Sequence, residues 1–210
     1  MYVLLNCHTA YTRDTTSDSI LAGGSLKAAD PFDIGAGHID PLRAVDPGLV
    51  YEMKTRDYII FLCNIGYSKQ KIRTIVLPFP GLDTRCSKVL QSNANINYPS
   101  ITVSNLKSTV TIKRTVRNVG HKKNTFYFAT IVEPDGVEVF IWPRVLFFSW
   151  FNDENTYYVT FKPQKKSQGR YDFGEIVWSD GFHKVRSPLV VFVNTTADHY
   201  ADSTTSTTTI

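Results

Sequence analysis

Hydrophobic and polar residues alternate along most of the second half of the chain, and this alternation constrains the fold more than any other feature of the sequence. One face of the first clear run carries Val110, Ile112 and Val116. The side chains between them are polar: Thr109, Thr111, Lys113 and Thr115. A period of two is typical of a β-strand with one buried face. Further strands are predicted at Phe126–Val132, which is apolar on both faces, and at Val137–Ile141, Tyr157–Phe161, Tyr171–Trp178 and Val185–Val193.

Turn sequences separate these runs. The Asp180-Gly181 pair between Trp178 and Phe182 predicts a tight hairpin, and Glu133–Gly136 contains both proline and glycine. The six runs named above fall within about 100 residues, and about seven short strands in such a length are typical of a two-sheet antiparallel β-sandwich of the immunoglobulin or fibronectin type. The cysteine pair and the Cys-to-Trp spacing that mark immunoglobulin domains are missing from the sequence, so we favour a fibronectin type III-like sandwich.

Before about residue 95 the sequence is rich in turns and predicts helix rather than strand. An apolar stripe at spacings of three and four predicts an amphipathic helix over Thr55–Ile65, with Thr55 as its cap: Tyr58, Phe61, Leu62 and Ile65. Ser68 can cap a second short helix that ends at Ile72.

The composition of the last residues differs from that of both preceding parts of the chain. Ser203–Thr209 consists only of serine and threonine, which have nothing to bury, so we predict a disordered tail. The chain is therefore expected to divide into residues 1–94, a mainly β domain over residues 95–193, and a Ser/Thr-rich tail over residues 194–210.

Composition excludes several classes of protein. Of the 210 residues, 42% are hydrophobic and 20% charged, which is ordinary for a globular protein. Apolar stretches such as Pro188–Val193 are far shorter than a membrane-spanning helix requires, and Met1–Leu5 lacks the basic flank and cleavage site of a signal peptide. The net charge of +4 is too small to indicate nucleic-acid binding. We therefore expect neither nucleic acid nor membrane as a partner.

The cysteine and histidine residues do not form a metal motif. Cys7, Cys63 and Cys86 allow one disulfide and leave one thiol, and none belongs to a Cys-x-x-Cys pair. The histidines are scattered, so we expect no metal site and no cofactor. Asn194-Thr195-Thr196 is a sequon for N-glycosylation at Asn194.

An ordered series of motifs runs from about Thr9 to about Val193: Ala29–Tyr51 (ADPFDIGAGHIDPLRAVDPGLVY), Asp57–Tyr67 (DYIIFLCNIGY), Asn97–Ile101 (NYPSI), Arg114–Gly120 (RTVRNVG), Phe173–Gly181 (FGEIVWSDG) and Val185–Pro188 (VRSP). With this series the chain resembles the C-terminal part of the plant subtilisin-like serine proteases (cucumisin-like subtilases, peptidase family S8). Each motif alone is weak, but their order and spacing make the resemblance specific.

The resemblance implies how the chain is organised. Residues 1–94 correspond to the end of the α/β catalytic domain with linker helices, and residues 95–193 to the fibronectin type III-like domain. The family's catalytic Asp, His and Ser lie upstream, and the Gly-Thr-Ser-Met motif of its nucleophile does not occur in this sequence. We therefore expect no catalytic residue in this chain and no proteolysis from it alone. The family also carries cysteines at positions matching Cys63 and Cys86, which implies a disulfide between them and leaves Cys7 unpaired.

Other interpretations of single motifs are weaker. His38 lies near Asp33 and Asp40, but its Gly35-Ala36-Gly37 context is typical of a structural turn rather than of a catalytic base. The same glycines do not complete a dinucleotide-binding loop, because position 40, where the third glycine should stand, is Asp and position 41 is Pro.

Two sets of side chains could form binding surfaces. Basic residues cluster in sequence at Lys107, Lys113, Arg114, Arg117, Lys122 and Lys123, and again at Lys162, Lys165, Lys166 and Arg170. They could bind an acidic polysaccharide, but we favour a solvated rim. Trp142, Trp150 and Trp178 could form a carbohydrate platform, but we favour core or interdomain packing.

From the resemblance we expect the C-terminal fragment of a secreted serine endopeptidase of the apoplast or cell wall. Its partners would be the upstream catalytic domain and the protein substrates of that enzyme, and its fibronectin-like domain would stabilise the catalytic domain and influence substrate access. The alternative is a stand-alone secreted module that recognises a protein or polysaccharide. Apolar side chains of the first part are expected to stay partly exposed without the catalytic domain: Phe32, Ile34, Leu49, Val50, Tyr58, Phe61 and Leu62.

Overall fold

The computed structural model describes residues 9–24, 26–76, 85–86 and 92–195. Cys7 and the predicted Ser/Thr-rich tail after residue 195 lie outside these ranges. The strands of the second half are β2 (Ile101–Leu106), β3 (Val110–Asn118), β4 (Thr125–Val132), β5 (Val137–Trp142), β6 (Val145–Phe148), β7 (Glu154–Pro163), β8 (Asp172–Ser179) and β9 (Lys184–Val193).

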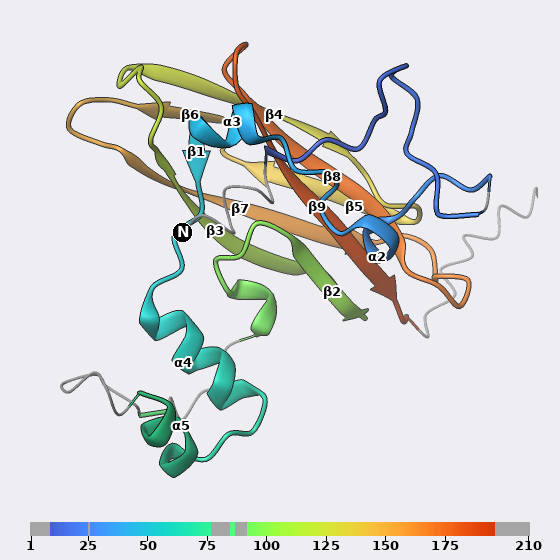
Figure 1. Cartoon of the computed structure of the whole chain (residues 1–210). Helices are drawn as coiled ribbons and strands as arrows, with labels where there is room; N and C mark the ends of the chain where they lie inside the picture. The colour runs from blue at the N-terminus through green and yellow to red at the C-terminus, as the bar shows by residue number, and fades with distance from the viewer. Residues whose placement is uncertain (1–8, 25, 77–84, 87–91, 196–210) are drawn as a thin grey trace, which may run out of the picture.

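These strands form two packed sheets (Figure 1). One sheet has the order β1-β3-β7-β5, where β1 is Leu49–Val50, and the other has the order β2-β9-β8-β4-β6. The pairs are antiparallel except that β2 runs parallel to β9. The fibronectin type III-like sandwich expected from the alternation is confirmed, with this one parallel pair in place of a wholly antiparallel arrangement.

The core lies between the two sheets and is built from alternate residues of each strand. On β3, Ile112 and Val116 point inward, and Trp178 of β8 is completely buried. The ring of Trp178 packs edge-on against Tyr157 of β7, with 5.0 Å between ring centroids, so the two sheets meet through aromatic contact. This paired burial explains why the strand pattern of the sequence predicts the architecture.

In the second half of the chain, two strands were not predicted from the sequence. β6 consists of Val145, Leu146, Phe147 and Phe148 and shows no alternation of residue type, although its exposure alternates. β2 alternates for only a few residues before Asn105. The predicted strand Phe126–Val132 is present as β4, but its outer side chains Phe126 and Phe128 are about half exposed.

The short strand β1 extends the sandwich beyond the expected start near residue 95. Leu49 and Val50 pair with Asn118 and Arg117 of β3, and both are buried. The following Tyr51 is buried too, and its hydroxyl lies 2.8 Å from that of Tyr157. The expectation that Leu49 and Val50 stay partly exposed is therefore wrong, because the sandwich itself covers them.

Helices α4 (Thr55–Asn64) and α5 (Lys69–Val76) lie apart from the sheets, on the opposite side from α3 in Figure 1. Lys54 is the N-cap residue of α4, one position before the predicted cap, and its backbone N–H donates to Asp57. The Ser68 hydroxyl accepts from the N–H of Lys71, as a cap of α5 should. The helix continues to Val76, four residues beyond the predicted end at Ile72.

We call residues 9–48 the N-terminal segment. It contains two short helices, α2 (Pro31–Ile34) and α3 (Pro41–Val45), which begin with proline after an aspartate cap at Asp30 and Asp40. Part of this segment lies against the outer face of β8 and β9, where Arg186 of β9 donates to the backbone oxygen of Ala36 at 2.9 Å.

Candidate functional site

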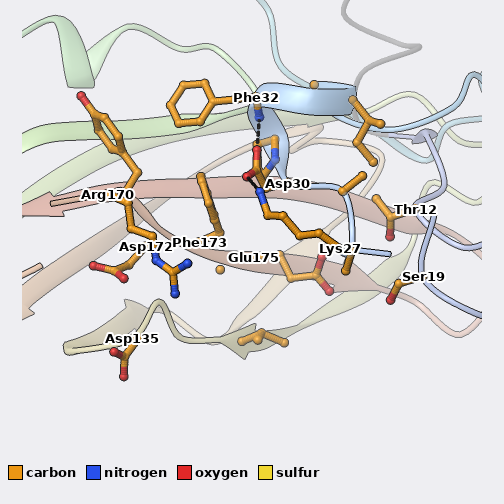
Figure 2. Close-up of a pocket in the computed structure, with 18 of the residues that line it drawn as sticks. Thr12, Ser19, Lys27, Asp30, Phe32, Asp135, Arg170, Asp172, Phe173 and Glu175 are labelled. Carbon is orange, nitrogen blue, oxygen red and sulfur yellow. Dashed lines mark hydrogen bonds and ion pairs between the residues drawn. The ribbon is translucent and has the colours of Figure 1, made fainter. Parts of the chain in front are cut away.

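A groove of about 740 Å³ separates the N-terminal segment from the sandwich. Figure 2 shows Asp30 and Phe32 of the α2 region on one wall, with Arg170, Asp172 and Phe173 coming from the chain that enters β8. The groove is therefore formed by segments that lie about 140 positions apart in the sequence. It exists only because the N-terminal segment folds back over the outer face of the sheet.

Aromatic contacts hold α2 over the groove. The ring centroid of Phe32 lies 5.3 Å from that of Tyr171 and 5.7 Å from that of Phe173, both in edge-on geometry. Phe32 nevertheless stays 67% exposed. Its free face extends the apolar lining of the groove toward solvent.

Charged side chains frame the same groove. The ammonium of Lys27 lies 2.6 Å from Asp30 and 3.7 Å from Asp33, and its hydrogen bond holds the pKa of Asp30 below the usual value. On the sheet side, Arg186 forms an ion pair with Glu175. Among the described residues that line the groove there is no histidine or cysteine.

Large apolar side chains are exposed along the N-terminal segment beyond the groove. Leu42 on α3 is 86% exposed, and others project into solvent as well: Leu21, Leu26, Ile39 and Val45. Leu42 and Val45 lie three positions apart on the same short helix. Neighbouring exposed apolar side chains of this kind often mark a site of contact with another protein, so α3 is a candidate contact surface.

His38 does not assemble a catalytic triad with the nearby carboxylates. Its backbone pairs with Tyr11, and its exposed ring lies against the Tyr11 ring with 5.6 Å between centroids. Asp33 accepts the backbone N–H of Asp30, and Asp40 accepts that of Arg43. Both carboxylates act as helix caps, which agrees with the structural interpretation of this turn.

The glycines around His38 also have structural roles. Gly37 has a φ of +118°, and a Cβ atom placed on it would lie 2.4 Å from the backbone oxygen of Tyr11. Any side chain here would displace the bridge between Tyr11 and His38. The requirement for glycine is therefore steric, which agrees with the structural turn expected from the sequence.

One member of the basic clusters is buried, which corrects the prediction of a solvated rim. Arg114 is 2% exposed, and its guanidinium donates to four backbone oxygens: Tyr98 at 3.0 Å, Ala94 at 2.6 Å, Lys113 at 2.9 Å and Ser100 at 3.3 Å. It fixes the segment before β2, including the 3₁₀ turn η1 (Asn93–Asn95), to the sandwich. The alternation of β3 contained the signal, since Arg114 falls in phase with Ile112 and Val116.

The three tryptophans divide between core and surface. Trp178 lies in the core as predicted, whereas Trp142 and Trp150 are more than 70% exposed and do not pack in the core. Trp142 stands beside Tyr158 on the outer face of the four-stranded sheet, with 6.4 Å between ring centroids. Phe140, two positions before Trp142, is exposed on the same face.

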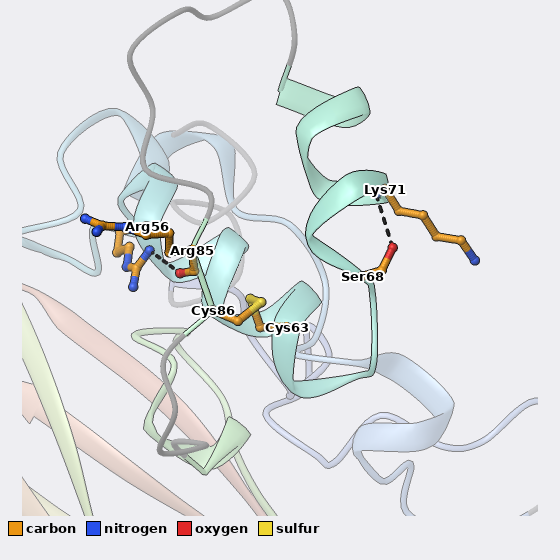
Figure 3. Close-up of a disulfide and its surroundings, with 6 residues drawn as sticks. All are labelled: Arg56, Cys63, Ser68, Lys71, Arg85 and Cys86. Atoms are coloured by element: carbon orange, nitrogen blue, oxygen red, sulfur yellow. Dashed lines mark hydrogen bonds between the residues drawn. A yellow bond between two sulfur atoms is a disulfide. The ribbon is translucent and has the colours of Figure 1, made fainter.

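Cys63 and Cys86 form a disulfide with an S–S distance of 2.08 Å (Figure 3). The bond ties α4 to the chain 23 positions downstream, and Arg56 of α4 adds a hydrogen bond to the backbone oxygen of Arg85 at 2.9 Å.

Asn194, the residue of the predicted sequon, is exposed just after β9, and its amide lies 3.1 Å from that of Asn105.

A polar cluster that was not predicted from the sequence joins the N-terminal segment to the β8–β9 hairpin. His183 contacts Asp180 through Nδ1 at 2.9 Å and Asp46 through Nε2 at 3.2 Å. Asp46 and His183 are far apart in the sequence, so no local spacing could have linked them.

Comparison with known proteins identifies the family. Residues 95–191 match a fibronectin type III domain model. The subtilisin-like protease SBT3.18 of Arabidopsis thaliana is 59% identical over 187 residues, which are 89% of this chain and 24% of that protein. SBT5.3 and SBT3.6 of the same plant are 42% and 37% identical, over 87% and 93% of this chain and 23% and 25% of their own lengths.

The chain belongs to the plant subtilisin-like protease family. It matches the C-terminal region of these enzymes and spans about a quarter of the length of the curated relatives. Among solved structures, the cupredoxin domain of amoB from Nitrosocaldus yellowstonii aligns with 41% of this chain and 56% of its own, with a TM-score of 0.33 and 8% identity, which is too low to bear on function.

Two further observations concern the part of the chain that the structure describes. In that part, no three histidine, cysteine or acidic side chains gather closely enough to hold a metal ion. None of its helices has both the length and the apolar character needed to cross a bilayer.

Proposed function

We propose that this chain is the non-catalytic C-terminal region of a secreted plant subtilisin-like serine endopeptidase, and that its N-terminal segment docks the sandwich onto the catalytic part of the enzyme. The observation that carries the proposal is the contrast within the N-terminal segment. The segment is fixed to the sandwich at Ala36, through Arg186, and at its C-terminal end, where β1 follows, whereas its Leu26, Leu42 and Val45 remain exposed.

Burial energetics support a protein partner for this surface. Covering a large aliphatic side chain stabilises a complex by about 1.5–3 kcal/mol per residue, before the entropic cost of association. A partner that covers Leu42 and Val45 would thus supply part of the free energy that holds the sandwich in a defined position. The sandwich would then stabilise the catalytic domain and limit the approach of substrates from one side.

The proposed location outside the cell rests on the disulfide and on the family. A Cys63–Cys86 bond persists in an oxidising compartment, and Asn194 is exposed at the surface, where a glycan can attach. The purified secreted chain should therefore lose mass when it is treated with a deglycosylating enzyme. The Asn194→Gln variant should keep the same mass after that treatment.

Docking can be tested with the catalytic part of the relative SBT3.18, produced without its C-terminal region, and this chain added separately. We expect binding by titration calorimetry, weakened at least tenfold by Leu42→Glu with Val45→Glu, since two charges would then have to be buried. Lys162→Glu on the four-stranded sheet is the control and should bind normally. Equal binding of both variants, or none by the unmodified chain, would contradict the proposal.

The proposal also predicts that the chain alone does not hydrolyse peptides, because an acyl-transfer enzyme needs an activated nucleophile. A fluorophosphonate probe should leave every serine unlabelled. Stoichiometric labelling of one serine would refute this part of the proposal.

A second candidate function, binding of a polysaccharide, has one observation in its favour. Trp142, Tyr158 and Phe140 present aromatic rings together on the outer face of the four-stranded sheet. Such rings can stack on the apolar face of a sugar. Retention of the chain on insoluble plant polysaccharide, lost in Trp142→Ala and kept in Phe126→Ala on the other sheet, would favour this function over docking.

A further inference from the structure

The corner where the N-terminal segment enters the sandwich is built around a histidine held between two carboxylates. His183 lies between Asp180, at 2.9 Å from Nδ1, and Asp46, at 3.2 Å from Nε2. Asp180 belongs to the same hairpin as His183, whereas Asp46 follows α3 in the N-terminal segment. A single side chain thus bridges two separate parts of the fold.

The backbone approaches this histidine closely. Gly48 has a φ of +74°, and a Cβ atom there would lie 2.5 Å from the Tyr127 hydroxyl and 2.7 Å from the ring of His183. The backbone oxygen of Gly48 accepts N–H groups of Val119 and Gly120 at 2.9 and 3.2 Å. The corner therefore fits tightly while His183 stays in place.

The charged and titratable groups around His183 come from four elements. The hairpin supplies Asp180, which is 3% exposed, and the N-terminal segment supplies Asp46. β4 supplies the hydroxyl of Tyr127, 3.4 Å from Nδ1. The loop after β3 supplies His121, which is 93% exposed and 4.0 Å from Asp46, and Lys122, whose ammonium lies over the ring of Phe182. Two carboxylates close to the imidazole favour its protonated form.

We propose that protonated His183 is an acid-dependent clasp that holds α3 and the corner at Asp46–Gly48 against the β8–β9 hairpin, and that the clasp loosens as the imidazole loses its proton. The rest of the N-terminal segment stays attached through contacts that do not titrate in this range, namely the Arg186 bond to Ala36 and the packing of Phe32 on β8. The movement is therefore confined to α3 and its flanks. This inference concerns the chain by itself and does not depend on the proposed function.

The direction of the effect follows from the two titrating groups. Burial opposes charge on His183, but hydrogen bonds to Asp180 and Asp46 outweigh it and raise the pKa of His183 above its usual 6.5. The contribution of protonated His183 to the stability of the corner is therefore fully present below pH 6.5, and it is lost as the pH rises through the folded-state pKa of His183. Burial likewise opposes charge on Asp180, but hydrogen bonds from His183 hold the pKa of Asp180 below its usual 3.8. The contribution of ionised Asp180 is lost only as the pH falls through this lowered pKa. The clasp is therefore tightest between about pH 3.8 and pH 6.5.

Hydrogen–deuterium exchange of the full chain at about pH 5.5 and about pH 8 tests the clasp, with labelling times scaled for the chemical exchange rate. Backbone protection over residues 40–48 should fall about fivefold at the higher pH, as expected for the loss of an ion pair worth about 1 kcal/mol. Protection over β8 and β9 should not change, which shows that the sandwich remains folded.

Three variants separate the clasp from other causes. His183→Gln and Asp46→Asn should each show the same low protection over residues 40–48 at both pH values. His121→Gln, the matched control, should keep the full pH dependence. The proposal is overturned if the unmodified chain shows equal protection at both pH values, if His183→Gln keeps the pH dependence, or if His121→Gln abolishes it.

Discussion

The sandwich and the helical pair α4–α5 are stabilised in different ways. The sandwich contains nearly all of the buried apolar side chains, and its two sheets meet through Tyr157 and Trp178. By contrast, α4 buries only Ile59 and α5 only Ile72, and the pair is tied to its surroundings by the disulfide and by a few polar contacts. From this difference we expect the fibronectin-like part to fold by itself and the helical pair to depend on the covalent link.

The boundary between the two kinds of region does not coincide with the change of sequence pattern. Leu49, Val50 and Tyr51 precede the helices in the chain but pack in the sandwich. Tyr51 donates or accepts hydrogen bonds with Tyr157 and Ser187, at 2.8 and 2.7 Å. Burial holds the pKa of the Tyr51 phenol well above its usual value, so this network stays neutral and intact. The sandwich thus includes a strand contributed from before the helices.

The largest effect on stability should come from Arg114. Arg114→Ala leaves four backbone oxygens without their charged donor and should lower the free energy of unfolding by about 3–5 kcal/mol. Arg114→Lys should recover only part of this loss, because an ammonium cannot reproduce the planar fork. Urea unfolding followed by tryptophan fluorescence measures both. Lys113→Ala is the control, and an equal loss there would remove the distinction between the buried and exposed faces of β3.

Substitutions of Leu49 on β1 and Leu42 on α3 test the difference between a leucine buried in the sandwich and one exposed on the N-terminal segment. Leu49→Ala should lower the free energy of unfolding by about 2–5 kcal/mol, because Leu49 is fully buried in the sandwich. Leu42→Ala should change it by less than about 0.5 kcal/mol, because Leu42 is exposed on α3. The same urea titration serves both variants. Similar losses would show that the two leucines do not differ in environment.

Removal of the disulfide should affect the helices and leave the sandwich intact. Cys63→Ala with Cys86→Ala opens a loop closed over 23 positions, and the chain-entropy model assigns about 3 kcal/mol to such a loop. Amide protection on α4 should fall, while the urea midpoint of the sandwich should change little. A matching fall in protection of β3 and β7 would show that the two regions unfold as one unit.

The sequence predicted the sandwich because alternation, turns and strand length all indicated the same fold. Arg114 lies in phase with Ile112 and Val116 of β3, but we expected it on a solvated rim because it belongs to a run of basic residues. The sequence could not predict the burial of Leu49 and Val50, because two apolar residues after a glycine turn have no period of their own. The contact between His183 and Asp46 depends on how a hairpin and a distant corner meet, which no local spacing encodes.

Hydrogen–deuterium exchange on the free chain tests the central claim of this account most directly, namely that the sandwich begins at β1 and that the helices form a separate, weaker unit. Peptides covering Leu49–Tyr51 should exchange as slowly as those from β3 and β7, while peptides from α4 and α5 should exchange at least about tenfold faster. If residues 49–51 instead exchange together with α4, the division proposed here is wrong.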